Sequence, residues 1–523
     1  MVSMLLCRLA DALGACASGR RTGRAAWLSI LLSSAALAAC APLTPLDRPA
    51  FADPSTRAEH GALAMHAAAA EGALGDGESA FWLLEDNADS LRVRIALADL
   101  AEETLDIQYF IWQDDMTGRL LMKHVLDAAD RGVRVRFLID DLAVVGRHAE
   151  LESLDAHPRI EVRVFNPWRL RSPLIRPFEF VTRMNVLNHR MHNKVLVADG
   201  RFAILGGRNI GDRYFGVYDN FVQNDVDLML AGALVGDVMA SFETYWISEN
   251  SRPVGGAGDA STIRALCEES VAANAEMLVA FATPPDGWNA YFAALVEKAT
   301  KGRGRLLLDP PNVDEQSPTA LYEHFKAMIA EAREDLIISS PYLVPDSELI
   351  ELIADLVERG VRVRILTNSL ASNSHVIAHS AYKKWRRALL AAGAEIYEMR
   401  SDAEVLERYK TPPAEPKWLA LHTKAVVVDG RTSFVGSPNV DPRSMILNTE
   451  IGVIADDPEL AAALVRLLER DMAPANSWRV TLENGGWLKW WNGDERVDRQ
   501  PAKGFQQRAV EFFLNLLPIK NQA

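Results

Sequence analysis

The chain has 523 residues, of which 49% are hydrophobic and 24% are charged, as is usual for folded globular proteins. This composition excludes a disordered or fibrous chain, and the length leaves room for two or more hydrophobic cores. The formal net charge of −14 argues against broad binding to nucleic acid, which depends on many Lys and Arg side chains displacing counterions from phosphates.

The first 39 residues have the features of an export signal. Arg20, Arg21 and Arg24 precede an apolar run, residues 25–36, that is short for a membrane span. The run ends in Leu37-Ala38-Ala39-Cys40, which resembles the lipobox of bacterial lipoproteins. We therefore expect residues 1–39 to be a lipoprotein-type signal peptide and Cys40 to carry lipid, with an uncleaved signal anchor as the alternative. Either way, we expect the protein to be held at a membrane surface, facing the periplasm.

Cysteine usage agrees with this interpretation. Cys7 and Cys16 would leave with the signal, so that Cys267 would be the only thiol besides the lipidated Cys40, and no intramolecular disulfide could form. Residues 1–39 carry four Arg and one Asp, and their removal would bring the net charge to −17.

The body of the chain alternates strand-like and helix-like segments. Residues 40–79 are rich in Ala and Pro and are interpreted as a tether. In the first lobe, residues 80–251, apolar periodicity predicts a strand at 105–112, a helix at 120–129 and a strand at 133–139.

The same order returns in a second lobe, residues 315–475. A strand is predicted at 336–339, a helix at 347–358 with Asp346 or Ser347 as N-cap, and a strand at 361–366. The segment Arg131–Arg136 also recurs as Arg359–Arg364, which indicates an internal duplication of roughly 230 residues. We expect an α/β fold in which each duplicated lobe is a mixed sheet flanked by helices.

Two further segments complete the expected organisation. Residues 252–314, punctuated by Gly and Pro, are interpreted as the connection between the lobes. Residues 476–523 form a C-terminal extension in which Trp487, Trp490 and Trp491 surround Lys489 and an apolar run follows at 512–517. Aromatic residues beside Lys suggest contact with a membrane interface, and a helix docked into the core is the alternative.

Each lobe contains one copy of the same polar motif. The pattern is His-x-Lys, four residues, Asp-Gly, five residues, then Gly-Gly or Gly-Ser, one residue and Asn. The two copies are His192, Lys194, Asp199, Gly206, Gly207 and Asn209 in the first lobe and His422, Lys424, Asp429, Gly436, Ser437 and Asn439 in the second. The Asp-Gly pairs predict hairpin turns, so each His and Lys should lie at the open end of a hairpin.

Such a pair suits displacement at a phosphodiester. One imidazole can attack phosphorus, and the second can protonate the leaving oxygen and later deprotonate the incoming one. Lys194 and Lys424 can donate to the phosphate oxygens, as can Asn209 and Asn439. Gly207 and Ser437 would let backbone and a hydroxyl approach the phosphate.

A catalytic histidine also needs a partner on its other nitrogen to fix its tautomer. Asp227 and Glu450 each follow a motif copy on a strand-like stretch and are the candidates. Asp225 lies two residues before Asp227, on the same expected strand face, and stays open as an alternative.

Other polar residues have two interpretations. His375 and His379 follow a predicted strand end and either line the site or lie in a solvated loop. Asp140 and Asp141, at the end of another strand, either face the site or cap the next element. His189 is interpreted as an ordinary hairpin residue.

The duplicated motif resembles the paired HKD motifs of the phospholipase D superfamily. The resemblance covers most of the chain after residue 80 and implies two similar lobes whose motifs meet at one central site, a phosphohistidine intermediate, and no metal or other cofactor. It implies that Asp199 and Asp429 act structurally within the catalytic motif. It also favours His192 as the nucleophile and His422 as the general acid and base.

Further segments look like those of cardiolipin synthases, above all the C-type branch. They are Gly206–Phe215, Thr367–Leu370, Pro341–Asp346, Asn439–Ser444 with Asn448–Glu450, and Leu516–Ile519. The resemblance implies transfer of a phosphatidyl group onto phosphatidylglycerol, with phosphatidylethanolamine or another phosphatidylglycerol as donor. The pair of N-terminal membrane spans of the A-type enzymes is absent, and a lipid anchor at Cys40 could replace it. The alternative is hydrolysis of phospholipids by water, with a nuclease less favoured.

Overall fold

The computed structural model describes residues 54–144, 146–168, 187–256, 258–312, 318–483 and 485–515. The expected signal peptide, Cys40, the start of the tether and residues 516–523 lie outside these ranges. Apart from Trp168, the described residues belong to one compact unit formed by Arg48–Pro167 and Asn185–Ala523. The description below concerns this unit.

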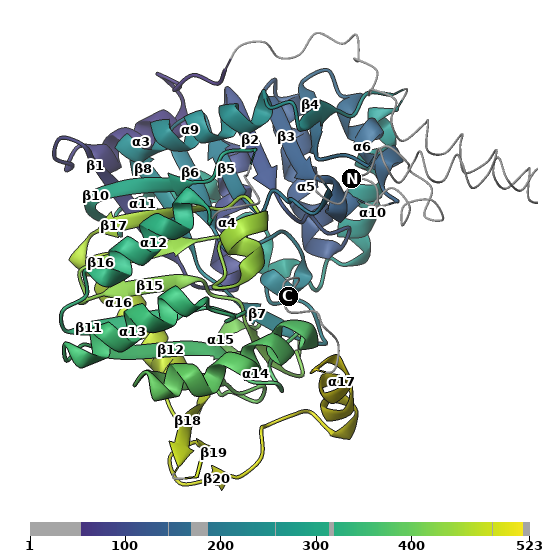
Figure 1. Ribbon diagram of the computed structural model, residues 1–523. Coiled ribbons are helices and arrows are strands. Elements are labelled where there is room, and N and C mark those ends of the chain that lie inside the picture. The colour runs from purple at the N-terminus through teal and green to yellow at the C-terminus, as the bar shows by residue number, and fades with distance from the viewer. Residues whose placement is uncertain are drawn as a thin grey trace, which may run out of the picture. The chain divides into compact units, whose positions relative to one another are not determined.

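The first half of the chain contributes eight strands to a mixed sheet, most of which are labelled in Figure 1. Strands β2, β3 and β4 are mutually parallel, and the remaining pairings are antiparallel. In spatial order the strands are β9 (Ser251–Pro253), β4 (Ile160–Phe165), β3 (Arg134–Asp140), β2 (Thr104–Tyr109), β5 (Lys194–Ala198), β6 (Phe202–Gly206), β8 (Asp227–Gly232) and β1 (Glu78–Leu84).

The second half has the equivalent strands in the reverse order, followed by two further strands. In the same spatial sense, starting beside β1, the strands are β10 (Thr300–Leu308), β17 (Ile451–Asp456), β16 (Thr432–Gly436), β15 (Ala425–Val428), β11 (Asp335–Ser339), β12 (Arg362–Asn368), β13 (Glu395–Met399), β18 (Ser477–Glu483), β19 (Trp487–Trp491) and β20 (Arg496–Val497). Strands β1 and β10 pair antiparallel, Ser79 opposite Gly302, and join the halves into one sheet of 18 described strands. The duplication predicted from the sequence is therefore a pseudo-twofold relation about this pair.

Helices pack against the sheet in both halves (Figure 1). Several begin at an Asp whose carboxylate accepts from a backbone N–H of the first turn, which satisfies donors that the helix itself leaves free. Asp346 caps the predicted helix α13 (Ser347–Glu358) in this way at 2.8 Å. The other principal helices are α3 (Ala62–Glu71), α4 (Asn87–Leu100), α5 (Met116–Asp130), α6 (His148–Asp155), α9 (Ala233–Trp246), α10 (Ala260–Ala273), α11 (Gly287–Val296), α12 (Ala320–Ala330), α14 (Val376–Ala391), α15 (Leu406–Tyr409), α16 (Pro458–Met472) and α17 (Phe505–Asn515).

The two halves share part of their hydrophobic core. One cluster of buried side chains combines Val195 and Leu205 from the first motif hairpin with Val427 and Val435 from the second. Because burial of apolar area is the main stabilising contribution to folding, this shared cluster fixes the two hairpins against each other.

Three boundary expectations need correction. The predicted tether is wrong for residues 62–71, which form α3, with Leu63 and Ala67 fully buried. The inter-lobe connection contributes β10, a central strand, and the C-terminal extension adds β18 to the sheet beside β13. Among the described residues, no helix is both long and apolar enough to span a bilayer.

Candidate active site

The motif hairpins are built as the sequence predicts. Asp199 and Asp429 each have φ of 51°, and the following Gly200 and Gly430 have φ of 59° and 60°. Two successive left-handed residues make the tight turn that favours Asp-Gly. The carboxylate of Asp199 accepts from the backbone N–H groups of residues 102, 103 and 104, and that of Asp429 from those of residues 333, 334 and 335. Both aspartates therefore anchor the turn, at the far end of the strand from the histidine.

The motif lysines lie at the open ends of these hairpins. Lys194 Nζ donates to the backbone oxygen of His192, and Lys424 Nζ donates to that of His422, both at 2.5 Å. Both lysine side chains are almost completely buried. Lys424 Nζ is also 3.0 Å from Nδ1 of His422, so each cation is positioned beside its histidine.

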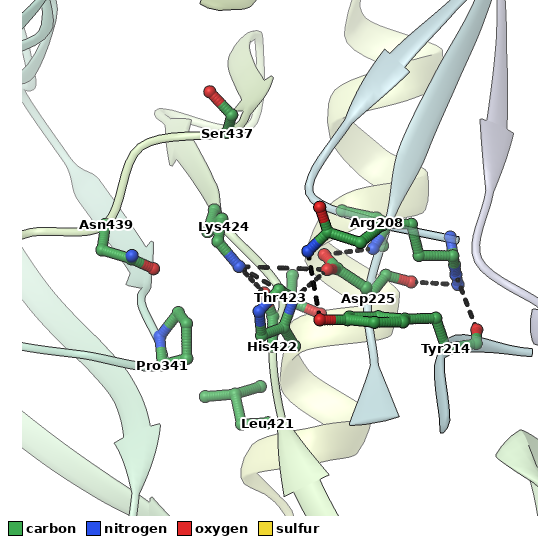
Figure 2. A network of polar contacts seen from close by, with 12 residues as sticks. Arg208, Tyr214, Asp225, Pro341, Leu421, His422, Thr423, Lys424, Ser437 and Asn439 are labelled. Carbon is green, nitrogen blue, oxygen red and sulfur yellow. Dashed lines mark hydrogen bonds and ion pairs between the residues drawn. The ribbon is translucent and has the colours of Figure 1, made fainter. Parts of the chain in front are cut away.

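Each histidine is oriented by a carboxylate from the other half of the chain. His192 Nδ1 donates to Glu450 Oε2 at 2.8 Å, across 258 residues of sequence. His422 Nδ1 donates to Asp225 Oδ2, as Figure 2 shows. Because Nδ1 is occupied in both rings, Nε2 is the nitrogen left for substrate.

Backbone hydrogen bonds also join each histidine to the other half of the chain. The N–H of His192 donates to the oxygen of Thr449 at 2.9 Å, and the N–H of His422 donates to that of Asn224 at 2.8 Å. Just before His422, β14 (Leu419–Leu421) pairs in parallel with β7 (Val222–Asn224) of the first half. Neither half alone holds an oriented histidine, so the two motif copies make one site.

The orienting role predicted for Asp227 is wrong, and the open alternative, Asp225, is the partner of His422. Asp227 instead accepts from Arg94 at 2.9 Å, Arg208 at 3.0 Å and Ser90 at 3.0 Å in the core of the first half. The alternation of side chains along a strand does not apply to Asp225, because β8 begins only at Asp227 and Asp225 lies before it. Aligning the repeats as Asp225-Val-Asp-Leu over Glu450-Ile-Gly-Val would have identified Asp225.

Gly207 and Ser437 contact the orienting carboxylates. A Cβ atom at Gly207 would lie 2.3 Å from Asp225 Oδ1, so only glycine leaves room for that carboxylate. Ser437, at the equivalent position, donates through Oγ to Glu450 Oε2 at 2.5 Å. Contact of these two residues with phosphate stays a prediction.

The two motif asparagines differ in their contacts. Asn209 is engaged at both ends: its Oδ1 accepts from the N–H of Ile111 at 3.2 Å and its Nδ2 donates to Tyr214 at 3.1 Å. Asn439 Oδ1 is buried without a hydrogen bond to any described residue. Asn439 is therefore the better placed of the two to bind a ligand.

Asp140 supports the residue before the first histidine. It accepts from the N–H of Met191 at 3.0 Å and from Arg190 at 3.2 Å, so it belongs to the surroundings of the site. His189 donates to the oxygen of Leu447 at 2.6 Å and joins the halves. His375 is the N-cap residue of α14, and His379 is buried within that helix.

Burial sets the protonation states of the site. It lowers the pKa of His192 to about 4 and that of Lys194 to about 7, and it places the pKa of His422 well below its ordinary value. Burial alone would raise the pKa of Glu450, but the charges of His192 and Lys194 and the Ser437 hydrogen bond together lower it. At neutral pH both imidazoles are therefore neutral and Glu450 is ionised.

After burial, the charges of Lys424 and Lys194 contribute most to the lowered pKa of His422, as expected for two motif copies that meet at one site. In the described part of the chain, no group of three or more His, Cys, Asp or Glu side chains could hold a metal ion. The two lysines supply positive charge for a phosphate at this site.

The sequence pattern of the family described as "Cardiolipin synthase, PLD-like domain" matches residues 95–246 and 325–472, one motif copy in each segment. The chain belongs to this family. It is an enzyme of the phospholipase D superfamily.

Similar proteins agree with this assignment. The chain is 34% identical over 463 residues to cardiolipin synthase C of Escherichia coli (strain K12), covering 85% of this chain and 96% of the relative. It is 28% identical over 399 residues to cardiolipin synthase A of Pseudomonas aeruginosa (strain LESB58), covering 75% and 66%. The crystal structure of phosphatidylserine synthase from Haemophilus influenzae Rd KW20 shares the fold, with a TM-score of 0.54, 15% identity, and coverage of 86% of this chain and 98% of that one.

Proposed function

We propose that this protein is a phosphatidyltransferase that makes cardiolipin from phosphatidylglycerol and a second phospholipid, either phosphatidylglycerol or phosphatidylethanolamine. The observation that carries the proposal is the pair of buried histidines, each held by a carboxylate of the other half. The 34% identity to cardiolipin synthase C over nearly its whole length supports the choice of substrates.

In the first step, neutral His192 attacks the phosphorus of the donor through Nε2. The phosphorus–oxygen bond to the donor headgroup breaks, and His422 gives the departing oxygen its proton. Glu450 stabilises the charge that develops on the His192 ring, since it accepts from Nδ1 at 2.8 Å. The negative charge of the bound phosphate favours protonation of His422, against the effect of its burial.

In the second step, the neutral His422 accepts the proton of a hydroxyl group on phosphatidylglycerol. The alkoxide oxygen attacks phosphorus, the phosphorus–nitrogen bond breaks, and His192 is regenerated. Lys194 and Lys424 can donate to the non-bridging oxygens in both transition states. If water replaces the lipid hydroxyl, the same steps give hydrolysis to phosphatidic acid.

Product analysis distinguishes transfer from hydrolysis. Purified protein is incubated with labelled phosphatidylglycerol and phosphatidylethanolamine in mixed micelles. Cardiolipin is the expected product, and phosphatidic acid without cardiolipin would replace transfer by hydrolysis. His192→Ala and His422→Ala should each abolish turnover, because the two imidazoles serve one site.

We also propose attachment to a membrane through lipid on Cys40, at the periplasmic face, with no role for nucleic acid. The lipobox-like sequence before Cys40 supports this attachment. The exposed aromatic side chains Trp487, Phe512 and Phe513 of the C-terminal extension support interfacial contact. Acyl labelling should mark the wild-type protein, and a Cys40→Ala protein that is still labelled would refute the anchor.

A further inference from the structure

The duplicated motif extends to an arginine in both copies. Arg213 follows Asn209 by four residues, and Arg443 follows Asn439 by four residues, in the aligned segments Gly206–Arg213 and Gly436–Arg443. The two arginines thus occupy equivalent positions on either side of the shared site.

Their contacts differ. Arg443 donates from Nη1 and Nη2 to the side chain and backbone oxygens of Asn188, at 3.2 and 3.1 Å, and so joins the halves. Within the described residues, the guanidinium of Arg213 has neither a hydrogen bond nor an ion pair, and it lies 5.2 Å from the centre of the Tyr214 ring. The side chain is half-buried.

Among the described residues of this acidic chain, a half-buried arginine without an ion pair is unusual. Other interior arginines are paired: Arg94 with Asp227 at 2.9 Å, Arg136 with Asp106 at 2.7 Å, and Arg386 with Glu398 at 2.6 Å. Removing a guanidinium from water without an anion costs free energy, so a position that keeps one suggests a ligand that supplies the anion.

Arg213 lies next to one catalytic histidine. The ring of Tyr214, which Arg213 contacts, packs edge-on against the ring of His422, with centroids 5.5 Å apart; Figure 2 shows both rings. The charge of Arg213 also contributes to lowering the pKa of His422, after burial and the nearer cations.

The charge of Arg213 also acts on two residues of the second half, Tyr342 and His375. The rings of Tyr342 and His375 pack edge-on with centroids 5.4 Å apart. The pKa of His375 is lowered by burial and by the charge of Arg213, and the same charge opposes the rise that burial causes in the pKa of Tyr342.

We propose that Arg213 binds the phosphodiester group of the acceptor phospholipid and so directs its headgroup hydroxyl to His422. This inference rests on the proposed function. A guanidinium can donate two parallel hydrogen bonds to a phosphodiester, which fixes orientation as well as position. Water has no such group, so Arg213 would favour transfer over hydrolysis.

The test compares a charged acceptor with an uncharged one. Wild type, Arg213→Gln and the exposed control Arg305→Gln are assayed with a phosphatidylethanolamine donor and either phosphatidylglycerol or glycerol as acceptor. Loss of a charge-assisted pair predicts a KM for phosphatidylglycerol about 10- to 100-fold higher in Arg213→Gln. Transfer to glycerol and formation of phosphatidic acid should stay within about twofold, and Arg305→Gln should match wild type for both acceptors.

The outcomes separate the inference from the proposed function. If wild type makes no cardiolipin, the proposed function fails. If it does and Arg213→Gln keeps the wild-type KM for phosphatidylglycerol, the acceptor subsite is refuted. An equal loss with both acceptors would also refute it, because Arg213 would then act on the shared chemistry. Should the glutamine variant not fold, Arg213→Lys keeps the charge without the planar fork, and its KM for phosphatidylglycerol should rise selectively.

Discussion

Gly207→Ala is expected to disable His422 without touching it. The new Cβ would lie 2.3 Å from Oδ1 and 2.7 Å from Oδ2 of Asp225, whereas real Cβ contacts almost never fall below 3.0 Å. The carboxylate must therefore move by roughly 1 Å, and a displacement of that size in a catalytic group costs about 100-fold in rate. Loss of a hydrogen bond to a charged group, about 1.5–3 kcal/mol, gives a similar factor.

The assay is kcat for cardiolipin formation, with thermal unfolding as a check on the fold. Gly236→Ala is the matched control, since a Cβ there meets nothing within 4 Å, and it should keep wild-type kcat. In an Asp225→Ala background, Gly207→Ala should have little further effect, because both changes remove the same contact. A folded Gly207→Ala enzyme with kcat within threefold of wild type would refute the reasoning.

Three further predictions concern the same site. Catalysis needs neutral His192 and charged Lys194, so kcat/KM should fall as pH decreases through about 4 and as it increases through about 7; a rate that is constant from pH 6 to 9 would contradict the pKa of Lys194. Glu450→Gln should lower kcat about 100-fold with little change in KM, because the carboxylate of Glu450 stabilises the charged His192 ring. The measurement is kcat at saturating donor, and an unchanged kcat would exclude that role. Asp199→Asn should lower the free energy of unfolding by about 1–3 kcal/mol in denaturant titrations while kcat stays within a few-fold, and the reverse pattern would make Asp199 catalytic.

Local signals made much of the fold predictable. Helix α13 runs from Ser347 to Glu358 as predicted, because an Asp cap and regular apolar spacing both mark it. Strand β15, Ala425–Val428, ends directly before Asp429-Gly430, where the Asp-Gly pair predicts a hairpin turn. The family match confirms the fold class and the recognition of the superfamily.

Long-range pairing was not predictable in the same way. Nothing local in residues 78–84 or 300–308 indicates that β1 and β10 pair and join the halves. The partner of His422 was left open between Asp225 and Asp227 because the choice depends on where β8 begins. The exchange of carboxylates between halves depends on the pseudo-twofold relation, which a one-dimensional pattern does not contain.

The exchanged carboxylates give a physical reason for keeping both copies in one chain. A single half would supply a histidine without its orienting acid, so it could act only beside a second copy with the same relation. Once both copies lie in one chain, the two sides are free to differ. Gly207 beside Asp225 in one copy corresponds to Ser437 beside Glu450 in the other. Among the described residues Arg213 has no hydrogen bond or ion pair, whereas its counterpart Arg443 joins the halves. Such differences let one histidine serve as nucleophile while the other serves the leaving group and the acceptor.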